Sequence, residues 1–433
     1  PSSDEHRAHR PYQRVLTTEV FVNRPRRVVV TGIGAITPIG VTVDGLWSGL
    51  QAQRSAVRSV TRFDPTPFRS HIAAEVDSFE PTDFLERKRA KRLDRFGQFS
   101  VAAARMALED AAIDLECENR ERIGAMMGTA LGGVGYAEEQ CGAYYTGGVK
   151  EIDPGLALMV FGGAASCNIA IEFGVQGPNS TNAMSCASGT IAVGDAFRQI
   201  RDGYADVMIC GGSEAPLWPL CFGAFAIIRA MSTRNEDPAS ASRPFDKDRD
   251  GFVMGECAAV LILEELNRAT ARGAKIYAEI LGYGCSNDAY HMTAPRPDGS
   301  AAALCMQRAL DDAHVSPVEV GYVNAHGSST PLNDTTETVA IKRVFGDHAY
   351  RIPVSGSKGY YGHALGASGA IEAAICSLAL SNRWLPPTVN LANPDDGCDL
   401  DYIPRSGRPA NVELMLSNSF GFGGINAAIV LRG

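Results

Sequence analysis

The sequence predicts an α/β fold, and three observations support this prediction. Short strand-like apolar runs alternate with longer helical patterns along most of the chain, as parallel or mixed sheets require. A hydrophobic content of 45% and the presence of 45 glycines are typical of a compact α/β enzyme with many tight turns. At 433 residues the chain exceeds one ordinary domain, so we expect two packed halves.

The expected elements follow one another in a regular order. Strand-like runs rich in Val, Ile and Leu cover 28–31, 123–129, 206–211, 258–264, 277–283 and 427–431. Apolar residues at helical spacing cover 96–112, 187–202, 300–313, 334–345 and 364–381. A midpoint at 271–275 divides the chain into an N-terminal half, 26–274, and a C-terminal half, 275–433, and no repeat is visible at the level of identity. We expect residues 1–25 to form a flexible N-terminal extension.

Composition and charge restrict the setting in which the protein works. The eleven cysteines are scattered without Cys-x-x-Cys pairs, which argues for a reducing compartment and against a disulfide framework or a metal site. No apolar run reaches the ~18 residues of a membrane helix, and the first 25 residues lack the apolar centre of a secretory signal. The net charge of −9 disfavours nucleic acid. We therefore expect a cytoplasmic protein without membrane or nucleic-acid partners.

The glycines at 31–40 suggest a dinucleotide-binding motif, an interpretation that we reject. The run Thr-Gly-Ile-Gly-Ala-Ile-Thr-Pro-Ile-Gly follows an apolar strand, but Thr37 stands at the third fingerprint position and Pro38 follows it directly. A tight turn is the simpler expectation for these glycines.

Cys186 is the most informative residue in the chain. It lies in Ala-Met-Ser-Cys-Ala-Ser-Gly (183–189), directly before an apolar, small-residue helix pattern. A thiol at the N-terminus of a helix is expected to favour the thiolate and to react readily near neutral pH. The alternative is a buried structural cysteine, which is the commoner case for any single cysteine.

Two histidines in Gly-rich surroundings favour the catalytic interpretation of Cys186. His326 follows a strand-like run in Gly-Tyr-Val-Asn-Ala-His-Gly (321–327), and His363 opens a Gly- and Ala-rich helix pattern. Each histidine alone is more often structural, but a thiol with two imidazoles suits acyl transfer. The run Ser-Asn-Ser-Phe-Gly-Phe-Gly-Gly-Ile-Asn (417–426) adds a loop whose backbone N–H groups suit an oxyanion hole.

With these motifs the chain resembles the elongating β-ketoacyl-acyl carrier protein synthases, type II enzymes of the thiolase-like superfamily. The resemblance runs from about Arg26 to Gly433 and includes Ser-Arg-Pro-Phe-Asp (242–246), Asp-Ala-Tyr-His-Met-Thr (288–293) and Asn-Ala-His-Gly (324–327). It implies a thiolase-like fold of five layers, α-β-α-β-α, with two pseudo-repeated halves. It also implies a dimer with strand pairing across the interface, near the segment before Cys186.

The resemblance further implies a role for each site residue. Cys186 holds the growing chain as a thioester, while His326 and His363 promote decarboxylation of malonyl carrier protein. Other implied roles are the oxyanion hole for the N–H groups of Cys186 and Phe422, gating for Phe422, support for Lys358 and Glu372, and substrate binding for Leu131, Ser328 and Thr330. No metal or cofactor is implied, because the substrates arrive on the phosphopantetheine arm of acyl carrier protein.

Residues 87–95 contain six basic residues in nine and contrast with the acidic whole. We expect them to open an amphipathic helix that continues through Phe96 and Phe99. A solvated helix face is the alternative. In the resembled family a basic patch at this segment receives the acidic carrier protein, so we expect docking through Lys88, Lys91 and Arg92 with Arg89 as a helper.

Different motifs point to different pathways for the protein. The segment 153–160 departs from the commoner family pattern, and Asn333-Asp334 and Gly346-Asp-His-Ala are closer to ketosynthase subunits of type II polyketide systems. The run Asp288-Ala-Tyr-His-Met-Thr-Ala-Pro is closer to fatty-acid enzymes. We favour a type II polyketide or specialised-lipid role, with housekeeping fatty-acid elongation as the alternative.

Two further alternatives concern catalysis and assembly. A non-catalytic partner subunit resembling a chain-length factor is less favoured, because such subunits lack the nucleophile that Cys186 supplies here. The chain can still pair with such a subunit, so both a homodimer and a heterodimer stay open.

Overall fold

The strands of the computed structural model, which describes residues 25–433, form two groups of five with the same internal order. Residues 1–24, and with them nearly all of the expected flexible extension, lie outside the described residues. The first group is β1 (Val28–Thr37), β5 (Ile123–Gly128), β6 (Asn179–Asn182), β7 (Val207–Glu214) and β8 (Cys257–Glu265). The second is β9 (Ala278–Asn287), β10 (Tyr322–Ala325), β11 (Val354–Gly356), β14 (Leu414–Gly421) and β15 (Ile425–Arg432). Their spatial orders, β6-β5-β7-β8-β1 and β11-β10-β14-β15-β9, correspond strand by strand and confirm two pseudo-repeated halves.

The two groups join through their first strands into one sheet. β9 pairs antiparallel with β1 over the short register Val28–Val30 opposite Ala278–Ile280. Within each group the second strand is parallel to both of its neighbours, and the remaining pairs are antiparallel. The proposed division at 274/275 falls in the loop between α9 (Leu266–Ala271) and β9, and its status as a domain boundary stays a prediction.

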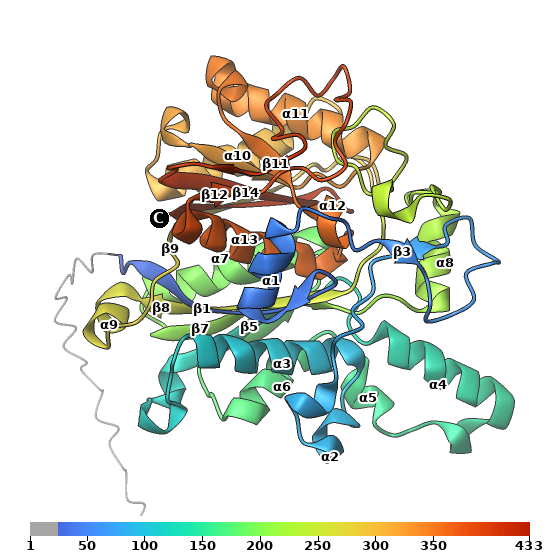
Figure 1. Ribbon diagram of the computed structural model, residues 1–433. Helices are drawn as coiled ribbons and strands as arrows, with labels where there is room; N and C mark the ends of the chain where they lie inside the picture. Colours follow the sequence, from blue (N-terminus) through green and yellow to red (C-terminus); the bar gives the residue numbers. More distant parts are fainter. Residues whose placement is uncertain (1–24) are drawn as a thin grey trace, which may run out of the picture.

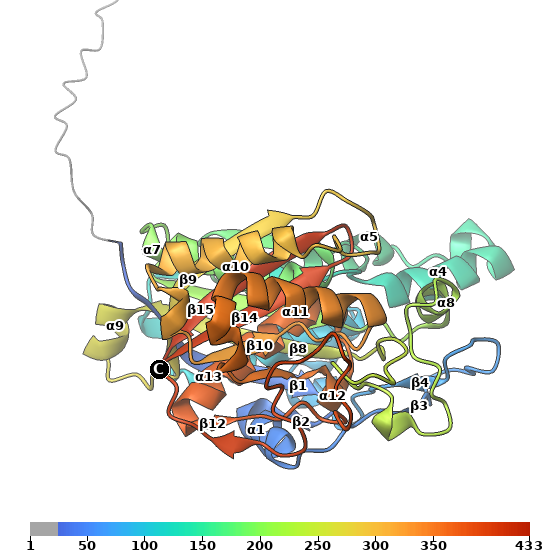
Figure 2. The same ribbon diagram turned by 90° about the horizontal axis from the view of Figure 1, so that it is seen from above.

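Five layers of helix and sheet are visible in Figure 1, which confirms the α-β-α-β-α prediction. The middle layer consists of α7 (Ser188–Arg201) and α13 (Ser368–Asn382), which contact each other and strands of both groups. α3 (Arg95–Asp110) and α6 (Ala164–Phe173) cover the outer face of the first group. α10 (Ser300–Ala313) and α11 (Pro331–Phe345) lie over the second group, as the view from above shows (Figure 2).

Every strand and helix predicted from periodicity is present, with shifted ends. The remaining helices are α1 (Thr42–Gln51), α2 (Arg87–Ala90), α4 (Val134–Gly147), α5 (Leu156–Met159), α8 (Pro219–Ile227) and α12 (Lys358–Tyr361). The short strands are β2 (Gly40–Val41), β3 (Arg58–Ser59), β4 (Ile72–Ala73), β12 (Trp384–Leu385) and β13 (Arg408–Pro409). Most of these elements are too short or too irregular in pattern to leave a clear periodic signal.

Gly32 and Gly34 lie inside β1, so the prediction that they form a tight turn is wrong. A Cβ atom on Gly32 would lie 2.2 Å from the carbonyl oxygen of Ala107, and one on Gly34 would lie 2.0 Å from that of Ala103. The two glycines instead let the backbone of α3 pack directly on the strand.

The basic segment does not open one continuous helix, contrary to the prediction. α2 ends at Ala90, and α3 begins at Arg95. Asp94 between them has extended backbone and accepts a hydrogen bond from the N–H of Phe96 at 2.9 Å. This is the geometry of a helix N-cap, and it starts a new helix in a new direction.

Every residue of α13 from Ser368 to Leu380 is buried. Within residues 25–433, the stretch Leu365–Asn382 is long and apolar enough to cross a membrane by length and composition, contrary to the expectation from sequence. Of this stretch, 89% is buried inside the protein, as expected of a core helix that packs against both groups of strands.

Candidate active site

Cys186 lies in a short 3₁₀ turn, η5 (Ser185–Ala187), that leads directly into α7. Ser185 adopts a φ of +51°, in the left-handed region that non-glycine residues rarely occupy. The hydroxyl of Ser188 donates to the carbonyl oxygens of Ser185 at 2.7 Å and of Thr129 at 3.0 Å. These bonds fasten the cysteine turn to the end of β5.

A second turn of the same construction follows His363. This turn, η9 (Leu365–Ala367), leads into α13, and Leu365 adopts a φ of +41°. The two turns read Ser-Cys-Ala-Ser-Gly (185–189) and Leu-Gly-Ala-Ser-Gly (365–369), and they contact each other. A short repeat at the level of identity therefore exists where none was expected.

His326 and His363 lie side by side, with their ring centroids 5.3 Å apart. The backbone N–H of His326 donates to Oε1 of Glu337 at 2.8 Å, and Nδ1 of His363 lies 2.9 Å from the hydroxyl of Ser368. Burial lowers the pKa of both imidazoles well below 6.5, and the positive charge of Lys358 lowers it further. Both rings are therefore neutral at neutral pH.

Burial raises the pKa of the Cys186 thiol to about 12. The charge of Lys358 and the backbone N–H groups of Phe422 and Cys186, which hydrogen-bond the sulfur, lower this pKa but do not offset the burial. The predicted preference for the thiolate is therefore wrong for the free protein, because desolvation outweighs the helix terminus. The predicted oxyanion hole formed by these two N–H groups stays a prediction.

The raised thiol pKa has a direct consequence for alkylation. The rate at which iodoacetamide modifies Cys186 is expected to rise about tenfold per pH unit between about pH 7 and 10 without a plateau. The physical reason is that the thiolate fraction keeps growing until the pH approaches the raised pKa. Peptide mass spectrometry of the Cys186 peptide measures this rate, and the urea-unfolded chain, where the rate should level off above about pH 9, is the control. A plateau at or below neutral pH in the folded protein would contradict the assignment.

Lys358 and Glu372 form a buried ion pair behind the histidines. Both side chains are fully buried, and the Lys358 ammonium contacts both the Glu372 carboxylate and the backbone carbonyl oxygen of His326. Burial raises the pKa of Glu372 to about 7, while Lys358 acts in the opposite direction. The pair connects α12, α13 and the end of β10 in one contact.

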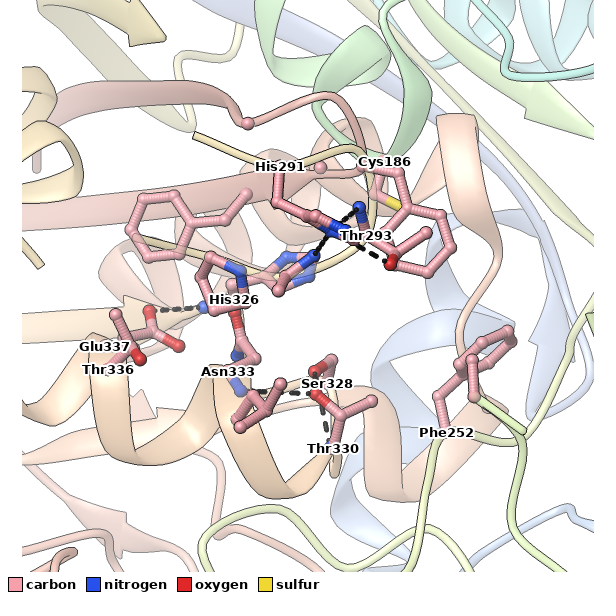
Figure 3. A pocket seen from close by; sticks show the side chains of 18 of the residues that line it. Cys186, Phe252, His291, Thr293, His326, Ser328, Thr330, Asn333, Thr336 and Glu337 are labelled. Atoms are coloured by element: carbon pink, nitrogen blue, oxygen red, sulfur yellow. Dashed lines mark hydrogen bonds between the residues drawn. The ribbon is translucent and has the colours of Figure 1, made fainter. Parts of the chain in front are cut away.

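Cys186, His326 and His363 line one cavity of about 380 Å³. Figure 3 shows Cys186 and His326 converging on it from different elements. Phe422 forms part of its wall, from the turn between β14 and β15, and stacks on Phe225 of α8 with the ring centroids 6.3 Å apart. A cavity of this size is within the range of small-molecule sites.

The structure brings some of the other predicted site residues to the cavity and leaves others away from it. Ser328 and Thr330 line it, and their hydroxyl oxygens lie 2.8 Å apart (Figure 3). Leu131 does not line it; it packs against the apolar cluster that contains Cys186.

The four predicted docking residues also lie outside the cavity. Lys88, Lys91 and Arg92 are exposed, on α2 and directly after it. Arg89 instead donates to the side chain of Asn168 on α6 at 2.7 Å and pairs with Glu172. These contacts hold part of its side chain inside the protein, and its role as a docking helper stays a prediction.

Three residues in or near the site were not predicted as site residues from the sequence. Glu337 accepts the backbone N–H groups of His326 and Gly327, each at 2.8 Å, and is buried. His291 lines the cavity, with its Nδ1 accepting the backbone N–H of Thr293 at 3.1 Å. Glu214 is buried at the end of β7, where the run Gly-Gly-Ser-Glu after an apolar strand offered the one signal available.

Comparisons with known proteins relate the chain to one family over nearly its whole length. The family model described as beta-ketoacyl synthase, N-terminal domain, matches residues 25–269, and the model described as beta-ketoacyl synthase, C-terminal domain, matches residues 277–392. A 3-oxoacyl-[acyl-carrier-protein] synthase 2 of Synechocystis sp. is 49% identical over 94% of this chain and 98% of its own. The protein of the same name from Coxiella burnetii is 45% identical over the same shares.

Solved structures agree with these sequence matches. A complex of a type II polyketide-synthase acyl carrier protein with its ketosynthase matches with a TM-score of 0.88 and 38% identity. A beta-ketoacyl synthase from Burkholderia phymatum matches with a TM-score of 0.87 and 36% identity. Each comparison covers 94% of this chain and 99% of the other.

Proposed function

Because the chain belongs to the β-ketoacyl synthase family, and is thus an acyltransferase and a condensing enzyme that elongates carrier-bound acyl chains, we propose that it works in fatty-acid chain elongation. The fatty-acid pathway is supported by the sequence identity of 41–49% to curated relatives named 3-oxoacyl-[acyl-carrier-protein] synthase 2, over 94–95% of this chain. This was the alternative at the level of sequence. The type II polyketide role that the sequence favoured is the second candidate, because two solved structures support it. One is the type II polyketide ketosynthase described above, and the other is the ishigamide ketosynthase/chain length factor.

In the first half of the proposed reaction, Cys186 accepts the acyl chain. A neutral imidazole of the cavity takes the thiol proton as the sulfur attacks the thioester carbonyl of acyl carrier protein. The N–H groups of Cys186 and Phe422, which hydrogen-bond the sulfur in the free protein, stabilise the oxygen anion of the tetrahedral intermediate. The tetrahedral intermediate then expels the carrier sulfur, which takes the proton back from the imidazole and leaves as a thiol, and the acyl chain stays on Cys186.

In the second half, the two histidines act on malonyl carrier protein. Both rings are neutral, so each can donate an N–H hydrogen bond to the thioester oxygen without repelling a cation. The bond between the methylene carbon and the carboxylate breaks, carbon dioxide leaves, and the electron pair becomes an enolate that these bonds stabilise. The enolate carbon attacks the Cys186 thioester, and the sulfur leaves as the β-ketoacyl product forms on the carrier.

The remaining cavity residues suit the two arms of the substrate. Ser328 and Thr330 offer paired hydroxyls for the amides of the pantetheine arm. The apolar cluster around Cys186, which includes Leu131 and Phe222, suits an acyl chain. Phe422 lies between these regions, and we assign it the gating role.

We expect acyl carrier protein to dock on the exposed basic residues Lys88, Lys91 and Arg92. Reversing Lys88, Lys91 and Arg92 to Glu should raise the KM for carrier-bound substrate about tenfold at low salt, since attraction becomes repulsion. Raising the ionic strength should shrink the difference between variant and wild type.

Steady-state kinetics at two salt concentrations measure this effect. A small acyl thioester without carrier protein is the control substrate, and its rate should not change. An unchanged KM for the carrier-bound substrate would place the dock elsewhere.

We also propose that the chain works as a dimer, a homodimer in the fatty-acid role or a heterodimer with a chain-length-factor-like subunit in the polyketide role. β6 ends the sheet, and Met184, two residues after it, is exposed. Leu158 and Phe161 are also exposed, a few residues before α6, which contacts β6. An open strand edge with apolar neighbours favours pairing with a second chain.

Intact-mass spectrometry with acyl carrier proteins that carry a series of acyl chains tests the proposed function. An adduct on Cys186 with saturated chains, followed by a β-keto product two carbons longer on addition of malonyl carrier protein, is the expected result. Acceptance of long saturated chains supports the fatty-acid role. Elongation only after addition of a chain-length-factor-like partner would favour the polyketide role, and no adduct under any condition would contradict both.

A further inference from the structure

Glu214 is a buried carboxylate that the reaction steps above do not use. It ends β7, and none of its surface is exposed (0%). Within the described part of the chain, its hydrogen-bond partners are backbone N–H groups and one hydroxyl, with no Lys or Arg among them. A buried anion that is held by neutral donors alone costs free energy unless these donors are fixed in place.

Four donors from two separate loops converge on this carboxylate. Oε2 accepts the N–H groups of Ala130 at 2.5 Å and of Gly366 at 2.9 Å. Oε1 accepts the N–H of Leu131 and the hydroxyl of Thr129, each at 3.1 Å. The first loop follows β5, and the second is the turn after His363, so one carboxylate joins both loops.

Each of these loops carries part of the candidate active site. Thr129 accepts the Ser188 hydroxyl that fastens the Cys186 turn, and Leu131 packs in the apolar cluster around Cys186. Gly366 occupies, in the second turn, the position that Cys186 has in the first. In the second turn the N–H of Gly366 donates to Glu214 at 2.9 Å.

The loops meet too closely at this point for any side chain to separate them. A Cβ atom on Gly366 would lie 2.3 Å from the backbone nitrogen of Ala130 and 2.7 Å from Oε2 of Glu214. Contact between the loops therefore depends on the carboxylate, which is the group that satisfies the N–H groups on both sides.

We propose that Glu214 is a positioning residue for the condensation: its carboxylate holds the loop of Leu131, which packs against the apolar cluster around Cys186, and the turn after His363 in one fixed relation to Cys186. This inference rests on the proposed function, because the roles of Leu131 and His363 come from it. It predicts that acyl-chain selectivity and the placement of His363 depend on the same side chain.

The substitution Glu214→Gln tests this directly. The amide keeps the size of the side chain but replaces one acceptor oxygen with an NH₂ donor, which then faces N–H groups of Ala130 and Gly366 or the N–H of Leu131. In the first orientation both loops lose a hydrogen bond to the side chain, and in the second the loop of Leu131 loses one. We expect kcat for condensation to fall about tenfold with little change in KM for malonyl carrier protein, and the preference among acyl chain lengths to change.

The matched control is Glu264→Gln. Glu264 is also fully buried, but Arg268 and Arg272 hold it, and it pairs with Val207 at the opposite end of β7. It therefore reproduces the loss of a buried carboxylate at a distance from the site. Thermal unfolding of both variants measures the stability cost separately from the catalytic effect.

A second readout does not require an active enzyme. N-alkylmaleimides of increasing alkyl length are added, and mass spectrometry of the Cys186 peptide gives the rate of modification for each. We expect Glu214→Gln to change the dependence of this rate on alkyl length, with wild type and Glu264→Gln behaving alike. If wild type formed no acyl adduct with carrier-bound substrates, the proposed function would fail, and the maleimide comparison would still decide the role of Glu214. A length dependence shared by all three proteins would overturn the inference.

Discussion

The substitution Cys186→Ala is expected to abolish acyl transfer, with condensation falling at least about a thousandfold. The thiol is the one nucleophile that the cavity offers next to two neutral imidazoles and two convergent N–H groups, and water or a histidine does not replace it. Intact-mass spectrometry should show no acyl adduct, and circular dichroism should show an unchanged fold.

The control for this substitution is Cys210→Ala. Cys210 is a fully buried thiol on β7 that does not line the cavity, so its removal tests the cost of losing a core thiol without losing the nucleophile. We expect this variant to keep its adduct and its condensation. Elongation that persisted in Cys186→Ala would mean that the acyl chain is held elsewhere.

The substitution Lys358→Met is expected to reduce the free energy of unfolding by about 3–5 kcal/mol. It leaves the carboxylate of Glu372 buried and unpaired, and it removes a contact to the His326 carbonyl oxygen. Condensation should fall as well, because His326 loses this support. Chemical denaturation measures the stability change.

A double variant separates the ion pair from the loss of packing. In Lys358→Met with Glu372→Leu, both charges are gone, so the protein should regain much of the stability lost in the single variant. Its condensation should remain low, because stability and the positioning of His326 are different properties. Equal stability of the single and double variants would show that the two charges do not interact.

The regular part of the fold could be predicted from the sequence because long apolar elements leave a periodic signal. The strands around β1, β7 and β8 and helices such as α3 and α13 appear where the pattern places them. The break at Asp94 was missed because the basic and apolar residues on both sides have helical spacing, and a single N-cap residue decides the direction of the chain. The glycines of β1 were misjudged because the packing of α3 on the strand is a long-range contact.

The site was predictable in its reactive residues but not in its electrostatics. Cys186, His326 and His363 stand in runs whose composition suggests turns and strand ends, and the fold brings them to one cavity. The direction of the thiol pKa shift depends on how deeply the fold buries the sulfur, which no local motif reports. Glu214 escaped notice because its partners are backbone groups distant in the sequence.

The middle layer determines how this enzyme can lose its activity on heating. The nucleophile stands directly before α7, and the turn after His363 stands directly before α13, the two helices that lie between the sheets and contact both halves. Local opening starts in exposed, weakly packed segments, and neither turn belongs to one. We therefore expect the arrangement of Cys186 and His363 to be lost on heating together with the cooperative unfolding of the core.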